Sequence, residues 1–168
     1  MANKDLRDWI NELEANDQLQ HVSGADHHEE IGAIVDIHMH KMTNPAVMFD
    51  EIPGFPKGNR VLANILTSVP RINIALGKPV DTSEIELVNY WREYMKAQPT
   101  HPPVEVNGGP LIENVFEGDD IDITTIPAPK WHELDGGYFI GTACMVVMKD
   151  PDSGWINYGA YRVQSHDA

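Results

Sequence analysis

The sequence predicts an α+β protein with an N-terminal α/β domain over residues 1–98, a linker at 99–110 and a region of strands at 111–168. Three observations lead to this division. Apolar residues recur at helical spacing in the first hundred residues, whereas the pattern beyond residue 110 is strand-like. Between the two regions, residues 99–110 hold four prolines and two glycines, a composition that excludes a continuous helix or a central strand.

The first expected helix runs from about Asp5 to Ala15 and is amphipathic. Its apolar residues follow the i, i+3, i+4, i+7 spacing that places side chains on one face: Leu6, Trp9, Ile10 and Leu13. A second helix is expected from about His28 to Met42, with Asp26 as its N-cap. The residues expected to face inward from it are Ile31, Ile34, Val35 and Met42. Both helices need an apolar layer to pack against.

Two short buried strands, residues 46–49 and 61–65, are expected to supply that layer, because both are rich in aliphatic side chains and a loop containing glycine and proline separates them. Residues 71–76 then precede Gly77, a typical helix stop. Ser83 and Glu86 form a capping box for a helix that continues to about Lys96. One face of this helix carries Leu87, Trp91 and Tyr94.

Strands are expected beyond the linker at residues 111–116, 138–148 and 155–164, with the turn-rich segment 149–154 joining the last two as a hairpin. Thr142 lies fifteen positions before Asn157, so we expect the two to pair across this hairpin. The preceding Asp135-Gly136-Gly137 is typical of a turn in which the glycines supply positive φ, or of a close approach between the backbone and a cofactor.

Composition limits the classes of partner. The formal net charge is −14, from 26 acidic and 12 basic residues, so we expect neither nucleic acid nor an anionic membrane as a partner. No apolar run approaches the roughly 18 residues that span a bilayer, and no secretory signal is found at the start, which predicts a cytoplasmic protein. The single cysteine, Cys144, lies in an apolar strand pattern, which favours a buried, unreactive thiol over a nucleophile.

Four histidines, at positions 27, 28, 38 and 40, suggest a transition-metal site, but their spacing argues against one. His38 and His40 are two residues apart on the expected helix, whereas helical metal ligands lie three or four apart. Solvated surface histidines are the preferred interpretation. The motifs of serine hydrolases and of nucleotide-binding phosphate loops are also absent.

Asn157 and Arg162 are the residues that point most directly to chemistry. An asparagine carbonyl oxygen can bind a hard divalent cation, and an arginine can hold a carboxylate or phosphate with two hydrogen bonds. Strand alternation places these two side chains on opposite faces, unless a twist or bulge at Gly159 lets them converge. A surface hydrogen bond and a surface charge remain the alternative interpretation.

Several segments together carry a resemblance to a known family. Asn-Tyr-Gly-Ala-Tyr-Arg at 157–162, Asp-Gly-Gly-Tyr at 135–138 with Gly-Thr at 141–142, and Gly-Asp-Asp-Ile-Asp at 118–122 resemble the UbiD family of reversible decarboxylases. N-terminal segments of the chain occur in the same order as in that family: residues 5–10, 13–14, 30–34, 45–49, 54 and 75–77. The resemblance therefore extends over the whole chain.

The resemblance implies a fold and an activity. Residues 111–168 would be the first strands of a flavin-binding split β-barrel, here incomplete. The activity would be reversible decarboxylation of an aromatic or α,β-unsaturated carboxylic acid, of the hydroxybenzoate type or another aryl acid, through prenylated FMN with Mn²⁺ and K⁺. The implied partners are this acid and CO₂, a flavin prenyltransferase that supplies the cofactor, and further copies of the chain in a homo-oligomer.

The resemblance also implies roles for particular residues. Asn157 would bind the divalent metal, and Tyr158 would offer its backbone carbonyl to the potassium ion. Arg162 would be the catalytic arginine, in contact with the substrate carboxylate. Thr142 and Ala160 would lie at the cofactor, as would Asn157 and Arg162.

The chain departs from the family pattern at its C-terminal end. The histidine and glutamate that complete the family's metal site, and the glutamates that transfer protons, have no counterpart in these 168 residues. We therefore expect an N-terminal fragment that is inactive alone. Two other interpretations stay open: a non-catalytic binding or assembly module, and an FMN-binding split-barrel oxidoreductase.

Overall fold

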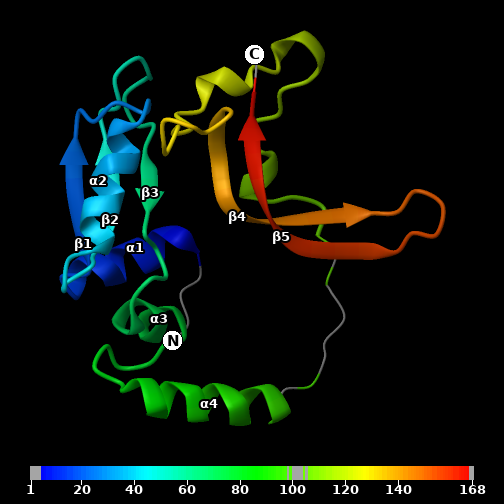
Figure 1. Cartoon of the computed structure of the whole chain (residues 1–168). Coiled ribbons are helices and arrows are strands. Elements are labelled where there is room, and N and C mark those ends of the chain that lie inside the picture. Colours follow the sequence, from blue (N-terminus) through cyan, green and yellow to red (C-terminus); the bar gives the residue numbers. More distant parts are fainter. Residues whose placement is uncertain (1–4, 98, 100–103, 105, 167–168) are drawn as a thin grey trace.

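The computed structural model describes residues 5–97, 99, 104 and 106–166, so part of the predicted linker at 99–110 lies outside the described residues. The structure is of the mixed α+β class, as the sequence predicts, with one three-stranded and one two-stranded sheet. The three-stranded sheet and its helices lie on one side of the molecule and the two-stranded sheet lies on the other (Figure 1). The split barrel itself stays a prediction.

The three-stranded sheet has the order β1-β2-β3. Strand β1 (Leu19–Ser23) runs parallel to β2 (Ala46–Asp50), and β3 (Val61–Ala63) pairs antiparallel with the other edge of β2. The two predicted strands correspond to β2 and β3. Strand β1 was not predicted, because its sequence Leu-Gln-His-Val-Ser has only two apolar residues and its edge position leaves it half exposed.

Two apolar clusters cover the two faces of this sheet. The first includes residues of helix α2 (Glu30–Met39) and consists of Ala25, Ile31, Val35, Val47, Phe49, Ile52 and Ala63. The second joins α1 (Leu6–Ala15) to α3 (Val69–Ala75) and consists of Trp9, Leu13, Ala46 and Ile74. Because Ala46 belongs to one cluster and Val47 to the other, successive residues of β2 face opposite layers.

The first two helices differ in how well the sequence predicts them. Helix α1 begins after Asp5, whose carboxylate accepts hydrogen bonds from the backbone N–H groups of Arg7 (2.8 Å) and Asp8 (3.0 Å). Helix α2 is shorter than predicted and is preceded by Glu29 in the left-handed conformation, so Asp26 is not its N-cap. The inward position predicted for Met42 is wrong, because the helix ends at Met39 and leaves Met42 fully exposed in the following turn.

Arg71 of α3 is fully buried, which the sequence did not predict. Its guanidinium donates hydrogen bonds to the carbonyl oxygens of Asn44 and Ile65 and to the Thr67 hydroxyl. Burial disfavours the charged form and lowers the pKa of Arg71. The side chain thus joins the turn before β2 to the segment that follows β3.

Helix α4 (Glu84–Ala97) confirms the predicted capping box. The Ser83 hydroxyl donates to the Glu86 carboxylate at 2.7 Å, and the Ser83 backbone N–H donates to the same oxygen at 3.0 Å. Of its residues only Leu87 is buried, while Trp91 and Tyr94 stack on each other with ring centroids 5.5 Å apart. Helix α4 lies apart from the sheets in Figure 1.

The strand predicted at residues 111–116 is wrong. The segment instead begins with a 3₁₀ turn, Pro110–Ile112, and further 3₁₀ turns follow at Gly118–Asp120 and Ile123–Thr125. Val115 and Phe116 are exposed. A strand needs a partner for its backbone groups, and none of the described strands runs beside this segment.

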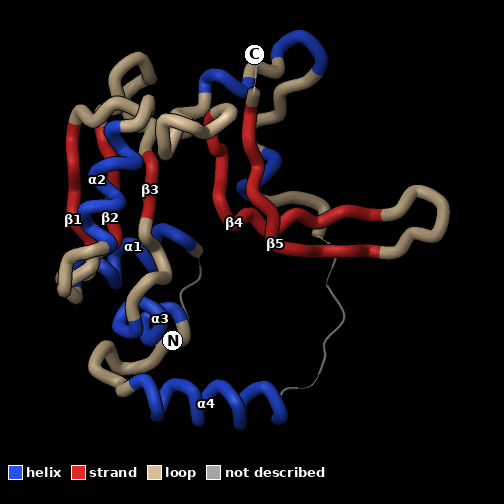
Figure 2. The backbone as a smooth tube through the Cα atoms, viewed as in Figure 1, coloured by secondary structure: helices blue, strands red, loops and turns tan. Residues whose placement is uncertain are grey.

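The second sheet is a long antiparallel hairpin of β4 (Tyr138–Lys149) and β5 (Ile156–Ser165), which matches the prediction closely. Asp150 organises the connecting turn, because its carboxylate accepts from the backbone N–H groups of Asp152 (3.1 Å) and Ser153 (2.7 Å). Both strands bend sharply part-way along their length, and the turn of the hairpin projects away from the rest of the molecule (Figure 2).

Candidate functional site

All five residues that the sequence singles out lie on the β4–β5 hairpin and are exposed: Thr142, Asn157, Tyr158, Ala160 and Arg162. The register of the hairpin decides which of them are neighbours. Asn157 pairs with Met148, and Thr142 lies six residues before Met148 on the same strand. The predicted pairing of Thr142 with Asn157 is therefore wrong.

Thr142 instead lies across from Arg162. Gly141 pairs with Val163 and Cys144 pairs with Tyr161, so between these pairs β4 has two residues where β5 has only Arg162. This two-against-one arrangement is a β-bulge, and a second register shift lies just before it, between Phe139 and Gly141. Thr142 and Ala143 therefore lie together opposite Arg162, and such irregularities bend a hairpin.

The position of the bulges corrects a second prediction. A bulge at Gly159 was the condition for Asn157 and Arg162 to converge, but the pairing along β5 is regular from Ile156 to Tyr161. Asn157 and Arg162 therefore lie on opposite faces of β5, and five residues at about 3.3 Å each separate them by roughly 16 Å along the strand. The two residues contribute to different parts of any site on this hairpin.

Within the part of the chain that the structure describes, Arg162 has no hydrogen-bond or ion-pair partner. Its cation is exposed and available to an anionic group. Asn157 lies at an open depression of about 340 Å³ near the turn of the hairpin, together with Met148, Lys149, Asp150 and Trp155. Asn157 thus lines the same depression as a lysine and an aspartate.

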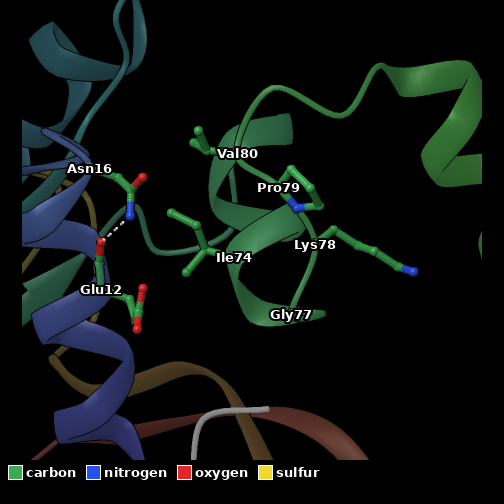
Figure 3. A pocket seen from close by; sticks show the side chains of 7 residues that line it. All are labelled: Glu12, Asn16, Ile74, Gly77, Lys78, Pro79 and Val80. Carbon is green, nitrogen blue, oxygen red and sulfur yellow. Dashed lines mark hydrogen bonds between the residues drawn. The ribbon is translucent and has the colours of Figure 1, made fainter. Parts of the chain in front are cut away.

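A second depression, of about 360 Å³, lies between α1 and the end of α3 and holds none of the predicted site residues (Figure 3). Its lining residues are Glu12, Asn16, Ile74, Gly77, Lys78, Pro79 and Val80. Ile74 and Val80 contribute apolar side chains and Glu12 and Lys78 contribute charges. The predicted chemistry belongs to the hairpin, not to this depression.

The described residues contain no group of three or more His, Cys, Asp or Glu side chains that could hold a metal ion. The prediction that the histidines are solvated needs correction for two of them. His38 is buried and bonds Ile34 O at 2.7 Å and Gln20 Oε1 at 3.0 Å, and His27 is half-buried. Cys144 is half-buried rather than fully buried.

The turn predicted at Asp135-Gly136-Gly137 lies earlier, at residues 132–135, where the Asp135 N–H donates to His132 O at 3.0 Å, and the glycines have a different role. Asp135 Oδ2 accepts hydrogen bonds from the backbone N–H groups of Trp131 (3.2 Å) and His132 (2.9 Å). Neither glycine has a positive φ. Glycine is needed at 137 because a Cβ there would lie 2.0 Å from the carbonyl oxygen of Ser165, at the end of β5.

Sequence reasoning missed the role of Tyr138, the first residue of β4. Its ring stacks on His27 and its hydroxyl contacts His28, more than a hundred residues earlier in the chain. The two histidines were noticed only as metal-ligand candidates. No local pattern indicated that they hold the start of the hairpin.

Two family descriptions match the chain. Residues 10–91 match the 3-octaprenyl-4-hydroxybenzoate carboxy-lyase N-terminal domain, and residues 103–168 match the Rift-related domain of the same carboxy-lyase family, UbiD. Among the described residues, no helix has the length and apolar character needed to cross a membrane.

Two curated relatives are decarboxylases. The chain is 30% identical to pyrrole-2-carboxylic acid decarboxylase of Pseudomonas aeruginosa, over 97% of its own length and 34% of that protein. It is 32% identical to phenolic acid decarboxylase of a Streptomyces species, over 98% of its own length and 35% of that protein. The chain thus spans about a third of the length of these relatives.

The fold is also similar to that of a solved enzyme, the vanillic acid decarboxylase of Sedimentibacter hydroxybenzoicus. Against its closed form the TM-score is 0.88 at 29% identity, covering 99% of this chain and 36% of that one. Against its open form the TM-score is 0.82 at 28% identity, covering 99% and 35%. The similarity thus extends over both the three-stranded sheet and the hairpin of this chain.

Proposed function

The chain belongs to the UbiD family, and from that membership we propose that it forms part of a reversible decarboxylase acting on an aromatic or α,β-unsaturated carboxylic acid through prenylated FMN. The observation that carries the proposal is the bulge that sets Thr142 opposite Arg162, which has no partner among the described residues, in a chain whose fold is similar to that of a vanillic acid decarboxylase. The relatives act on pyrrole-2-carboxylic acid, phenolic acids and vanillic acid, so aryl and heteroaryl acids are the proposed substrates.

Arg162 is the proposed contact for the substrate carboxylate. A guanidinium donates two parallel hydrogen bonds to a carboxylate, and this geometry orients the acid as well as binding it. The exposed Arg162 has no competing partner among the described residues. Thr142, across the bulge, adds a hydroxyl that can donate to the substrate or the cofactor.

The residues present fit one wall of a prenylated-FMN site. Asn157 offers a neutral oxygen of the kind that hard cations bind, Tyr158 offers a backbone carbonyl for K⁺, and Ala160 is small enough for a flat ring to approach the backbone. When bound, the cofactor supplies an electron sink for the pair released as CO₂ leaves. Mn²⁺ and K⁺ need further ligands, since Asn157 and Tyr158 supply only part of a coordination shell.

A chimera provides the test. This chain replaces the matching third of the Pseudomonas aeruginosa enzyme, the chimera is produced together with a flavin prenyltransferase, and CO₂ release is measured from a panel of aryl and heteroaryl acids. We expect release that requires the cofactor. If the chimera folds but releases no CO₂ from any acid, while the parent enzyme is active in the same assay, the proposal is refuted. The interpretation as a non-catalytic binding or assembly module would then be preferred.

Two substitutions in the chimera then separate the proposed roles. Arg162→Lys keeps the charge but loses the planar fork, so kcat should fall about a hundredfold while flavin absorbance stays normal. Asn157→Ala removes one metal ligand, so flavin and manganese content should both fall. Arg60→Lys and Asn89→Ala change exposed residues outside the hairpin and are the matched controls.

A further inference from the structure

A segment far from the N-terminal domain in sequence is held against the start of α2. The backbone of Lys130 donates to His27 O at 2.9 Å and accepts from the Glu29 N–H at 2.9 Å. A salt bridge of 2.8 Å joins Lys130 Nζ to Glu29 Oε1, and His27 Nδ1 contacts Ala128 O at 3.0 Å. Residues 128–131 therefore pair with the loop before α2 almost as a strand would.

Tyr138 extends this contact to the first residue of the hairpin. Its ring stacks on His27, with centroids 5.0 Å apart and planes 25° apart. Its hydroxyl lies 2.9 Å from His28 Nδ1. The next residue, Phe139, is buried and donates its backbone N–H to Pro129 O at 2.8 Å. The start of β4 is thus held through a ring, a hydroxyl and a backbone group.

The segment of residues 128–131 packs closely against α2. Trp131 packs against the apolar cluster that contains Ile31 and Val35. A Cβ added at Gly32 would lie only 1.9 Å from the carbonyl oxygen of Trp131, so the 128–131 segment lies directly on the backbone of α2. We call this set of contacts between residues 27–32 and residues 128–139 the His–Tyr joint.

The joint is well placed to set the direction of the hairpin. Strands β4 and β5 pack extensively on each other, and no other described helix or strand packs extensively on either of them. Tyr138 lies four residues before Thr142 and pairs with Ser165, three residues after Arg162. A rotation at Tyr138 would therefore move both residues of the proposed site relative to the N-terminal domain.

We propose that the His–Tyr joint positions the site, with Tyr138, His27 and His28 as positioning residues that fix the angle of the hairpin against the N-terminal domain. The consequence for catalysis rests on the function proposed above. The joint does not touch the substrate. It acts through Thr142 and Arg162, and a misplacement of about 1 Å at such residues can lower a rate on the order of a hundredfold.

The angle of the hairpin can be measured without any turnover. In the full 168-residue chain with Cys144→Ser, spin labels at Met39→Cys on α2 and at Asp152→Cys in the hairpin turn report one distance. We expect a narrow distance distribution. Gly32→Ala and Tyr138→Phe should broaden or shift it, whereas the exposed controls Ala33→Ser and Tyr94→Phe should not. Unchanged distributions in both joint variants would overturn the proposal.

The catalytic consequence is measured in the chimera. Tyr138→Phe and His28→Ala should lower kcat about tenfold or more with little change in KM, flavin content or melting temperature. His28→Gln keeps a partner for the Tyr138 hydroxyl and should recover most of the rate. A shifted distance with an unchanged kcat would overturn the positioning role. Absence of turnover in the unsubstituted chimera would count against the proposed function instead, because the label distances would still respond.

Discussion

Leu6 and Leu13 of α1 provide a matched pair that separates sequence pattern from tertiary packing. Both belong to the same apolar stripe, and both change to alanine without loss of helix propensity. Leu13 is 0% exposed and packs in the cluster with Trp9, Ala46 and Ile74, whereas Leu6 is 58% exposed. The sequence alone predicts equal costs for the two substitutions. The structure predicts very different ones.

Leu13→Ala should lower the free energy of unfolding by about 2–5 kcal/mol, through lost burial and the cavity left between α1 and β2. Leu6→Ala should lower the free energy of unfolding by less than about 1 kcal/mol, because an exposed leucine side chain has few packing contacts to remove. For a chain of this size, about 3 kcal/mol corresponds to roughly 6–12 °C in melting temperature.

The assay is urea unfolding followed by tryptophan fluorescence and by circular dichroism, with Leu6→Ala as the control. The two substitutions should shift the midpoint by clearly different amounts at a similar m-value. If the free energies of unfolding of the two variants agree within about 0.5 kcal/mol, then α1 is not packed on the sheet in solution as the structure shows.

Three further predictions follow from the structure. His21 lies between Asp50 (2.7 Å) and Glu14 (3.2 Å), and these carboxylates raise the pKa of His21, Asp50 most strongly. The two contacts therefore contribute fully to the free energy of unfolding below pH about 6.5, and this contribution is lost as the pH rises through the higher pKa of the folded state. Urea midpoints at pH 5.5 and 8.5 should differ less in His21→Asn than in the wild type. Ser83→Ala removes the capping-box hydroxyl and should cost about 1 kcal/mol, seen as fraying of α4 by hydrogen exchange, while Ser83→Asp should be tolerated. The exposed edges of the hairpin should cause self-association of the isolated chain in analytical ultracentrifugation. Val147→Lys, at a 65% exposed position, should reduce this self-association. A wild-type chain that is monomeric at all concentrations would contradict this expectation.

Local sequence patterns predicted the elements whose signals are themselves local. The periodicity of residues 5–15 and the capping box at Ser83 and Glu86 led to helices that begin within about a residue of their predicted starts. The turn at 149–154 predicted the hairpin, because Asp150 bonds to backbone groups within three residues of itself. Each of these features depends on contacts within one or two turns of chain.

Strands without a strong local signal were predicted less well. Strand β1 was missed because Leu19–Ser23 becomes a strand through pairing with β2, which lies 27 residues later in the chain. Residues 111–116 show the converse, since their apolar residues suggest a strand but no described strand pairs with them. Pairing with a distant segment decides both cases, and periodicity does not report it.

The sequence by itself determined which chemical groups the protein can offer: an arginine, an asparagine and a threonine on one predicted hairpin of an acidic α+β chain, in an order that predicted its family. Only the tertiary structure decided which of them are neighbours. The turn of the hairpin sets Asn157 opposite Met148, an extra residue on β4 places Thr142 and Ala143 together opposite Arg162, and contacts across 110 residues join His28 to Tyr138. The physical reason is that register and domain contacts depend on packing between distant segments, whereas side-chain chemistry is a property of each residue alone.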